Sequence, residues 1–408
     1  MENIIIIGAG FGGLYTTLYL KKYLKNKKII LFNKYNYFLF TPLLHEVATG
    51  GQNRHNIVLE IRELVNGKNC EFYATEVQKI DFNKKEIYFD NTKTMYVKLI
   101  ISLGSKANIT DVKGARQYAL PLKTIRDAIA IRTKIVRSLE KASVTKNQHE
   151  KEKLLCFAIM GGGPTGVELA GELSEFIHEL LPYYPKINPL LVKIYIIQRG
   201  PKIIPQLLHD KCIALATKQL RKKNVHVLLN SEVTEVREDY IIINNTTKIN
   251  AYNIFWTAGI IPRTIETIPQ ITNKEGYYEV NEFLEVKNLK DVYALGDCAL
   301  NYNPGSKKPN PALAQLAVKQ AKHLASNLYR EQNNRKKIPF IFKPEGFLVS
   351  VGSWWAIAEI KNKVLKGKFA WWLWRTIYLT KIIGIKNKVR IGIEWFILLF
   401  SKRDASEI

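Results

Sequence analysis

The hydrophobic pattern of the chain is dominated by short runs of branched and aromatic residues that no polar residue interrupts. Two of these runs, residues 4–7 and 154–160, lead directly into glycine-rich turns and then into stretches in which apolar residues have helical spacing. Unbroken apolar runs of this length are typical of strands buried on both faces of a parallel sheet. The pattern therefore predicts an α/β chain with two strand–turn–helix units about 150 residues apart. Further buried strands are predicted at 28–32, 99–103, 192–197 and 254–256.

Both glycine turns fit the spacing G-x-G-x-x-G, which is found in dinucleotide-binding turns. In such a turn the first glycine lets the chain turn, the second admits the pyrophosphate, and the third lets helix and strand pack closely. The helix that follows offers N–H groups and a positive dipole end to the phosphates. Two such turns predict two nucleotides brought face to face. The glycines are Gly8, Gly10 and Gly13 in the first turn, and Gly161, Gly163 and Gly166 in the second.

The residue that ends the second strand of each unit bears on which nucleotide binds. An acidic residue there usually holds the ribose hydroxyls, but this chain has Asn33 in the first unit and Gln198 in the second. Gln198 followed by Arg199 removes repulsion against a 2′-phosphate and supplies a cation, which suits NADPH. Arg199 can equally be a solvated loop residue, so both NADH and NADPH remain open as hydride donors.

Residues 37–51 form an apolar, aromatic and turn-bearing stretch that could line a flat ring. Flavin disulfide reductases place a redox cysteine pair at about this position, and this chain has none there, so we do not expect dithiol chemistry. The scattered cysteines fit a reducing compartment and predict neither a disulfide framework nor a metal site. They are Cys70, Cys156, Cys212 and Cys298.

Later in the chain, residues 291–294 predict a strand that ends in Gly296 and Asp297, where a carboxylate can meet a polyol chain. Residues 311–321 predict a helix of small residues with Gln315 projecting among them. As alternatives, Asp297 can be an ordinary N-cap and Gln315 an ordinary exposed side chain. A further helical pattern covers 121–139, and the polar stretches 141–153 and 332–337 are expected to be mobile loops.

The formal net charge is +25, from 61 Lys and Arg against 36 Asp and Glu. Three explanations are open: a nucleic-acid partner, a compositional bias towards Lys, Asn and Ile, or attraction to an anionic membrane surface. The position of the charge has to decide between them. A secretory signal is not expected, because the first strand begins by residue 3.

The C-terminal region changes in composition from Gly367 onwards. Residues 369–383 and 390–400 each mix aromatic and aliphatic residues with widely spaced charges, and 384–388 separate them. Both are shorter than the roughly 18–20 uninterrupted apolar residues of a spanning helix. They predict helices lying in the membrane interface, with Trp and Leu buried and Lys and Arg towards the headgroups. The alternative is a pair of amphipathic helices that form a dimer interface, and both can hold.

Over essentially its whole length the sequence resembles the type II NADH:quinone oxidoreductases, also called alternative NADH dehydrogenases. Motifs of the two glycine turns, of the aromatic stretch after the first unit and of the later strand and helix carry this resemblance. They are residues 7–14, 36–37, 42–44, 47–50, 162–173, 293–298 and 314–317.

The resemblance implies non-covalently bound FAD in the first turn, NADH or NADPH in the second, and a membrane quinone as electron acceptor. It implies that Asp297 holds the flavin ribitol, that Gln315 lies beside the isoalloxazine at the quinone mouth, and that Glu168 lies near the nicotinamide–flavin contact, where it assists proton delivery. Gln315, Lys319 and Gln320 are the expected quinone-site residues. The other expected cofactor contacts are Phe11, Gly12, Asn33, Lys34, Thr41, Pro42, Val77, Gly104, Gly296, Leu316, Pro164, Thr165, Gln198, Arg199, Ala258 and Gly259.

Three positions depart from the commoner family pattern: Asn33, Gln198 and Lys319. The first two leave the ribose contacts and the choice of nucleotide open, and Lys319 leaves open how the quinone is bound. No metal and no proton-pumping span is expected.

The resulting prediction is a split FAD domain (1–115 and 285–345), an inserted NAD(P)H domain (116–284) and a C-terminal membrane-binding segment (346–408). We expect a peripheral enzyme on the cytoplasmic face of a bacterial inner membrane, with no nucleic-acid partner, and the C-terminal segment is a candidate homodimer interface. The alternatives are a sulfide:quinone oxidoreductase, which needs a cysteine pair by the flavin, a soluble reductase, which needs no Trp-rich terminal helices, and a flavin-bound redox sensor that contacts nucleic acid.

Overall fold

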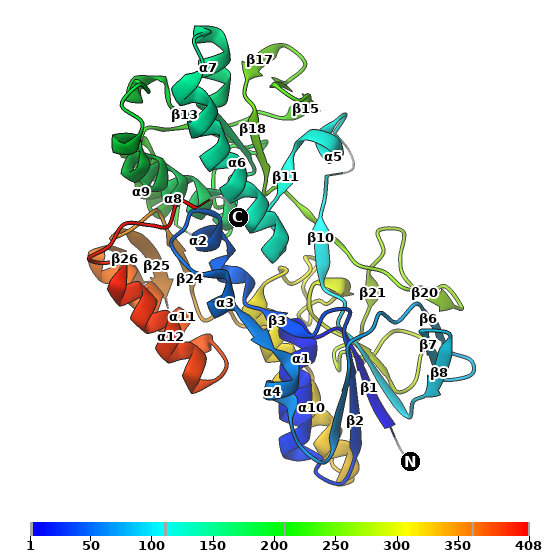
Figure 1. The fold of residues 1–408 in the computed structure, drawn as a ribbon. Helices are drawn as coiled ribbons and strands as arrows, with labels where there is room; N and C mark the ends of the chain where they lie inside the picture. Colours follow the sequence, from blue (N-terminus) through cyan, green and yellow to red (C-terminus); the bar gives the residue numbers. More distant parts are fainter. Residues whose placement is uncertain (1–2, 110–111, 208, 361–362, 407–408) are drawn as a thin grey trace. The chain divides into compact units, whose positions relative to one another are not determined.

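The structure, a computed structural model, describes residues 3–109, 112–207, 209–360 and 363–406. The chain forms two compact units, each assembled from three separate stretches of sequence. Figure 1 draws the chain coloured along its sequence. Unit 1 comprises Met1–Leu39, Val58–Lys106 and Ile260–Pro344, and unit 2 comprises Phe40–Ile57, Ala107–Gly259 and Glu345–Ile408.

Unit 1 is built on a five-stranded parallel sheet in the order β22-β9-β1-β2-β5. The isoleucines of β1 are buried, and Ile5 is paired with Ile30 on one side and Leu99 on the other, as expected for a strand covered on both faces. Helices α1 and α10 pack side by side (Figure 1). The bounds are β1 (Asn3–Ile7), α1 (Phe11–Tyr23), β2 (Lys28–Phe32), β5 (Cys70–Tyr73), β9 (Lys98–Ile101), β22 (Val292–Ala294) and α10 (Ala314–Gln332).

Smaller elements of unit 1 surround this sheet. A four-stranded sheet has the order β20-β6-β7-β8, and β3 pairs with β4 and β21 with β23. The bounds are β3 (Tyr37–Leu39), β4 (Val58–Glu60), α4 (Ile61–Val65), β6 (Lys79–Asp81), β7 (Glu86–Phe89), β8 (Thr92–Met95), β10 (Ser105–Ala107), β19 (Ile260–Pro262), β20 (Glu266–Ile268), β21 (Tyr278–Glu279), η4 (Gly296–Cys298) and β23 (Ala299–Leu300).

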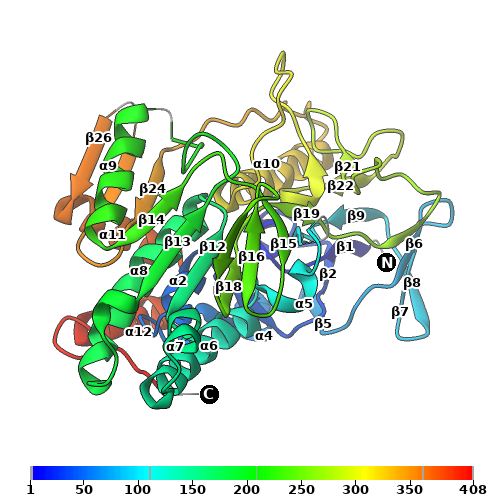
Figure 2. The same ribbon diagram turned by 90° about the horizontal axis from the view of Figure 1, so that it is seen from above.

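Unit 2 contains the second five-stranded parallel sheet, in the order β11-β18-β12-β13-β14, and an antiparallel sheet β15-β16-β17 (Figure 2). Its central strand β12 is buried throughout, like β1 in unit 1. The bounds are η1 (Thr41–Leu43), α2 (Leu44–Ala48), α3 (Arg54–Ile57), α5 (Ala115–Tyr118), β11 (Leu120–Pro121), α6 (Ile125–Val144), α7 (Gln148–Leu154), β12 (Cys156–Met160), α8 (Pro164–Leu180), η2 (Leu181–Tyr183), η3 (Pro189–Leu191), β13 (Lys193–Ile197), α9 (Asp210–Lys222), β14 (Val225–Leu228), β15 (Val233–Val236), β16 (Tyr240–Ile243), β17 (Thr247–Asn250) and β18 (Asn253–Trp256).

The C-terminal part of unit 2 is a three-stranded antiparallel sheet followed by two helices. Helix α11 packs on β25 and β26, and α12 contacts α3. Among the described residues, no helix combines the length and the apolar character that crossing a membrane requires. The bounds are β24 (Phe347–Ser350), β25 (Ala356–Ile360), β26 (Lys363–Gly367), α11 (Lys368–Lys381) and α12 (Ile385–Ile397).

The structure confirms the α/β prediction with two parallel dinucleotide-type sheets and corrects some local expectations. Residues 141–153 were expected to be a loop, but α6 continues to Val144 and α7 begins at Gln148. The side chain of Asn147 caps α7 by accepting a hydrogen bond from the Glu150 N–H group (3.2 Å), so a polar stretch becomes helical. The expected break over 384–388 is shorter: residues 382–384 separate the two helices, α12 begins at Ile385, and Gly384 before it has φ +84°.

The tryptophans of the C-terminal helices also differ from expectation. Trp371, Trp374 and Trp395 are each at most 6% exposed inside unit 2. The prediction that the tryptophans of this region lie in lipid is therefore wrong for these three, and Trp372 is the one left exposed. The reason is that α11 and α12 have a second apolar face, which packs against their own unit.

Candidate active site

The first glycine turn joins β1 to α1 in unit 1. A Cβ on Gly13 would lie 1.7 Å from the Gly8 carbonyl oxygen, so only glycine permits this close approach of helix and strand. Gly10, in contrast, has no neighbouring atom within 4 Å of its Cβ position, and no side chain caps the α1 N-terminus. An open approach to uncapped N–H groups suits a pyrophosphate. Gly12 and Phe11 belong to the first turn of α1, and Phe11 packs edge-on against Phe38.

The side chain of Asn33, at the end of β2, is hydrogen-bonded to this turn. Its Oδ1 accepts a hydrogen bond from the Ala9 N–H group (2.9 Å), and its Nδ2 donates to the Tyr35 carbonyl oxygen (2.7 Å). The neighbouring Lys34 is exposed and pairs with Glu76. The amide that replaces the usual acidic residue thus holds the glycine turn in shape.

The second glycine turn, between β12 and α8 in unit 2, repeats this arrangement. A Cβ on Gly166 would lie 2.0 Å from the Gly161 carbonyl oxygen, whereas Gly163 is open within 4 Å. Ala258, which leads to Gly259, lies directly against Gly161. Pro164 and Thr165 are the first residues of α8. The missing N–H group of Pro164 breaks no hydrogen bond there, because the first N–H groups of a helix have no partner within the helix.

Gln198 takes the same part in unit 2 that Asn33 takes in unit 1. Its Oε1 accepts a hydrogen bond from the Gly162 N–H group (2.8 Å), the residue that corresponds to Ala9. Arg199 is 82% exposed and 3.7 Å from Glu232. The turn therefore carries no acidic group at the position where a ribose is held, and a loosely tethered cation lies next to it.

Asp297 lies in η4 of unit 1, just after β22. Its Oδ2 accepts a hydrogen bond from the Ser105 hydroxyl (2.6 Å). Gln320 of α10 is fully buried, and its Oε1 accepts from the Gly296 N–H group (2.8 Å). Gln320 therefore holds the turn that carries Asp297, while its Nε2 has no partner among the described residues.

Among the other predicted residues of α10, Gln315 and Lys319 are four residues apart and share one face of the helix. Gln315 is half-buried in the first turn, and Leu316 is buried. The Lys319 ammonium donates to the Lys343 carbonyl oxygen (2.7 Å) and lies over the Phe342 ring.

The structure divides the predicted site residues between the units. Unit 1 holds the first glycine turn, Asp297, Gln315, buried Val77 and Gly104, the last at φ +69°. Unit 2 holds the second turn, Glu168, and also Thr41 and Pro42, which form η1.

Glu168, in α8, is buried beneath the C-terminal segment. Its Oε1 accepts from the Ser350 N–H group (3.3 Å), and its Oε2 lies 3.8 Å from His45 Nδ1. Burial raises the pKa of Glu168 well above its ordinary value, with a contribution from nearby Glu46. Burial therefore favours the protonated form of this carboxyl group.

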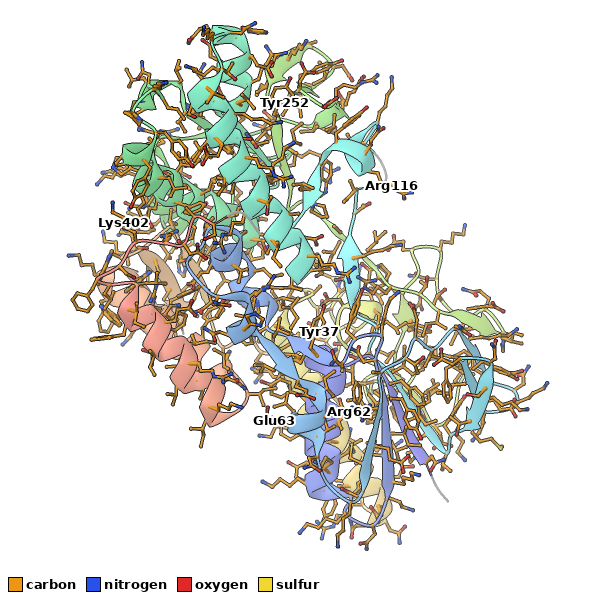
Figure 3. The ribbon with its side chains drawn as sticks, in the orientation of Figure 1. Tyr37, Arg62, Glu63, Arg116, Tyr252 and Lys402 are labelled. Atoms are coloured by element: carbon orange, nitrogen blue, oxygen red, sulfur yellow. The ribbon has the colours of Figure 1, made fainter. Side chains whose placement is uncertain are left out.

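Sequence reasoning missed the charged residues that surround Glu168. His45 and Glu46 were part of an expected ring-lining stretch, and Arg375 was assigned to a membrane surface. The structure buries His45 and Glu46, together with Glu172 and the Arg403 side chain, and Arg375 is half-buried. Charged residues inside otherwise apolar stretches were the available signal. Most other charges are exposed, including Arg116 and Lys402 (Figure 3).

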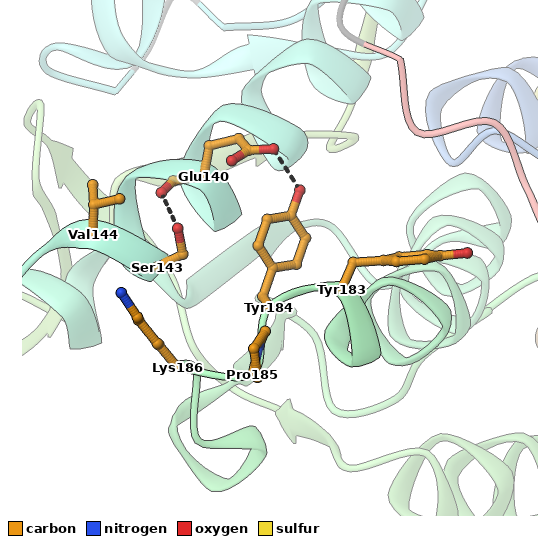
Figure 4. Close-up of a pocket in the computed structure, with 7 residues that line it drawn as sticks. All are labelled: Glu140, Ser143, Val144, Tyr183, Tyr184, Pro185 and Lys186. Carbon is orange, nitrogen blue, oxygen red and sulfur yellow. Dashed lines mark hydrogen bonds between the residues drawn. The ribbon is translucent and has the colours of Figure 1, made fainter.

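A separate hollow of about 330 Å³ lies between α6 and η2 in unit 2 (Figure 4). Tyr184 donates a hydrogen bond to Glu140 Oε1 at its wall (2.9 Å). None of the predicted site residues lines it. The lining residues are Glu140, Ser143, Val144, Tyr183, Tyr184, Pro185 and Lys186.

Two parallel sheets, each with a glycine turn after its central strand, define the class of an oxidoreductase that binds two dinucleotides. A family model described as pyridine nucleotide-disulphide oxidoreductase matches residues 2–321, and one described as NDH2 C-terminal domain matches residues 345–404.

Whole-length relatives narrow this class. A probable NADH dehydrogenase of Dictyostelium discoideum is 32% identical, over 99% of this chain and 91% of that protein. The type II NADH:quinone oxidoreductase Ndh of Mycobacterium tuberculosis is 27% identical, over 98% of this chain and 89% of that protein. The structure of NDH2 from Plasmodium falciparum in complex with NADH superposes with a TM-score of 0.89 at 25% identity, covering 99% of both chains. The chain belongs to the type II NADH dehydrogenase family.

Proposed function

We propose that this chain oxidises NADH and passes two electrons through bound FAD to a quinone, without pumping protons. The observation that carries this is the pair of equivalent glycine turns in a chain that matches type II NADH:quinone oxidoreductases over nearly its whole length. The activity of these oxidoreductases is electron transfer from NADH to a quinone, and two bound dinucleotide-type cofactors allow this transfer.

The residues of unit 1 fit FAD. The open side of Gly10 and the uncapped start of α1 leave room and N–H groups for a pyrophosphate, and Asp297 offers a carboxylate for a polyol chain. FAD, when bound, supplies the chemistry of accepting a hydride and releasing two electrons to the quinone. We assign the FAD domain to 1–115 and 285–345, the NAD(P)H domain to 116–284 and the membrane-binding segment to 346–408.

Within this assignment the protein binds and orients the reactants. Gln320 holds Gly296, and through it Asp297, in place. Gln315 and Lys319 contribute to the quinone site, and Glu168 holds the proton that reduction of the quinone requires. These roles rest on the positions of the residues in each unit and on the family resemblance.

The choice between NADH and NADPH depends on the two residues that follow β13. Gln198 carries no charge and is turned towards Gly162, and Arg199 is largely exposed. An absent carboxylate and a mobile cation allow a 2′-phosphate, so we propose that NADPH is also accepted. Asn33 and Lys34 take the corresponding positions on the FAD side.

The C-terminal helices bind an anionic membrane surface in this proposal. The exposed apolar residues of α12 recur at helical spacing on one face, and the buried Ile391 and Trp395 lie on the other. Lys368, Lys386 and Arg390 are exposed beside this face. Such a face suits a helix in the interface. The exposed apolar residues are Phe369, Trp372, Ile385, Val389, Ile393, Phe396, Ile397 and Phe400.

The same face could instead join two copies of the chain, and the two roles are compatible. Flotation with anionic and neutral vesicles tests membrane binding, and light scattering in solution tests the dimer. A quinone dissolves in the bilayer, so an enzyme on the cytoplasmic face of a bacterial inner membrane would meet its acceptor there. Protein that stays unbound with anionic vesicles contradicts the membrane role.

The deciding experiment is steady-state oxidation of NADH and NADPH by FAD-loaded protein with a soluble quinone. We expect quinone-dependent oxidation of both nucleotides in the absence of any added metal. Purified protein that retains FAD but reduces no quinone contradicts the proposed function.

A further inference from the structure

Unit 2 buries a cluster of ionisable residues that none of the assigned roles uses, apart from Glu168. We call it the buried charge cluster. It lies where α2, α8, α11, α12 and the C-terminal tail meet. Its members are Glu46, Glu168, Glu172, Glu175, Glu179, Arg375, Arg403 and Lys223, with neutral His45 among them.

Glu46 is placed unlike the other carboxyl groups of the cluster. It is 3% exposed, and its Oε2 accepts a hydrogen bond from the Trp395 indole N–H group (2.9 Å). Among the described residues, no Lys or Arg lies within 4 Å of Glu46 or of Glu168. Glu172, in contrast, pairs with Arg403 at 2.8 Å.

The balance of charge in the cluster requires protons. Arg403 is shared by Glu172, Glu175 and Glu179, and Lys223 pairs with Glu175. The Arg375 guanidinium lies between the rings of Trp371 and Trp395, 4.1 and 4.6 Å from their centroids. Glu179 is 37% exposed and can be hydrated, so four buried carboxyl groups face three cations. At least one of these carboxyl groups must be protonated for the buried part of the cluster to be neutral, and Glu46 and Glu168 are the two without a cation partner.

Unpartnered polar groups lie beside this pair. His45 is 2% exposed, with Nδ1 3.8 Å from Glu168 Oε2, and its Nε2 has no partner among the described residues. The Trp374 indole N–H group also lies near Glu168 without a hydrogen bond of ordinary geometry. Buried groups of this kind need a partner such as a buried water.

We propose that Glu46 is the proton store that reloads Glu168 during quinone reduction. This deepens the proposed function and rests on it. NADH and quinone yield NAD⁺ and quinol with the uptake of one proton. Glu168 releases that proton to a quinone oxygen, the Glu46 carboxyl proton then moves to Glu168, and Glu46 takes a new proton from solvent. Glu46 acts through Glu168 and does not touch the quinone.

The electrostatic surroundings support this role for Glu46. Burial raises its pKa to about 7, Arg375 lowers it, and Glu172 raises it. Burial lowers the pKa of His45 to about 3, so the imidazole beside Glu168 is neutral. The ionisable groups that face Glu46 are Glu168 and Glu172 on α8, Arg375 and Tyr378 on α11, and Arg403 in the tail.

The test uses FAD-loaded protein carrying Glu46→Gln, with Glu359→Gln as control. Glu359 is a similarly buried carboxyl group of unit 2, but it pairs with His209 outside the cluster. The rates of flavin reduction by NADH and of flavin reoxidation by a soluble quinone are measured separately across pH. We expect Glu46→Gln to slow only the quinone step, by at least about tenfold, and to abolish its dependence on pH near 7. The control should match the wild type.

Infrared spectra provide a readout besides activity. The wild type and the control should lose a protonated-carboxyl band as pH rises through 7, and Glu46→Gln should lack that band. If Glu46→Gln does not fold, Trp395→Phe serves, because removing the indole donor raises the pKa of Glu46 and should move both pH profiles upwards. An unchanged quinone step, or an unchanged infrared band in Glu46→Gln, overturns the proposal. A wild type that shows the band but reduces no quinone overturns the proposed function instead.

Discussion

Replacing Arg403 with methionine tests what holds the C-terminal tail on unit 2. The Arg403 side chain is 7% exposed and lies within 3.4 Å of three carboxylates of α8. The next residue, Asp404, pairs with Arg132 of α6 at 2.7 Å. The tail thus joins α6 and α8 through one residue each. Methionine keeps most of the side-chain volume and removes the charge and the hydrogen bonds.

The expected loss of stability depends on which partners the three carboxylates of α8 keep after the substitution. Removing one member of a buried ion pair costs about 3–5 kcal/mol, because the other charge stays buried and unpaired. Here Glu175 keeps Lys223, and Glu179 is 37% exposed and can be hydrated, so Glu172 is the residue left uncompensated. We therefore expect the lower end, about 3 kcal/mol, which corresponds to an opening equilibrium about 100-fold larger.

Hydrogen exchange of the α8 and tail amides measures this opening locally, which suits a chain of two units better than a global unfolding curve. Arg221→Met, on the exposed side of α9, is the matched control and should change exchange little. Adding Glu172→Gln to Arg403→Met should restore most of the lost protection. Protection of α8 that falls less than about threefold in Arg403→Met, or no recovery in the double variant, would refute the reasoning.

Four further results are expected. Gln198→Glu should shift preference from NADPH towards NADH in steady-state kinetics, because it places a carboxylate where a 2′-phosphate would lie; an unchanged ratio contradicts the account of cofactor choice. Gly10→Val should fold normally by circular dichroism, since its Cβ position is open, yet lose bound flavin in the absorbance spectrum. Ile393→Ser with Phe396→Ser should weaken flotation with anionic vesicles and leave oxidation with a soluble quinone unchanged. Because the folded-state pKa of Glu46 (about 7) exceeds its ordinary 4.5, its stabilising contribution is complete below pH 4.5 and lost as pH rises to 7; thermal unfolding of Glu46→Gln should depend less on pH over that range.

The parallel sheets were predictable because a strand buried on both faces leaves an unbroken apolar run, as in β1 and β12. The glycine turns were predictable because close packing excludes any side chain at Gly13 and Gly166. The ends of helices were less predictable from the sequence. Helix α6 begins at Ile125 because Thr124 and Asp127 form a capping box. The loop expected over 141–153 was wrong because composition does not register the cap supplied by Asn147.

The candidate site was predictable only in part. The two amides at the strand ends were recognised as departures, but their hydrogen bonds to the glycine turns depend on tertiary contacts 24 and 36 residues away in sequence. Gln320 was expected at the quinone, and the structure shows it holding Gly296. That contact does not test its predicted role at the quinone.

The sequence by itself determined the α/β class, the two nucleotide turns and the family, because these depend on local spacing that any fold of the chain must satisfy. Only the tertiary structure decided which charges are buried. Glu46 and Glu168 come from two separate stretches of sequence, and Arg375 and Arg403 come from a third. They meet inside one unit, and the protonation of the carboxyl groups depends on which partners burial leaves them. Burial and charge pairing are properties of the packed chain, so no local pattern reports them.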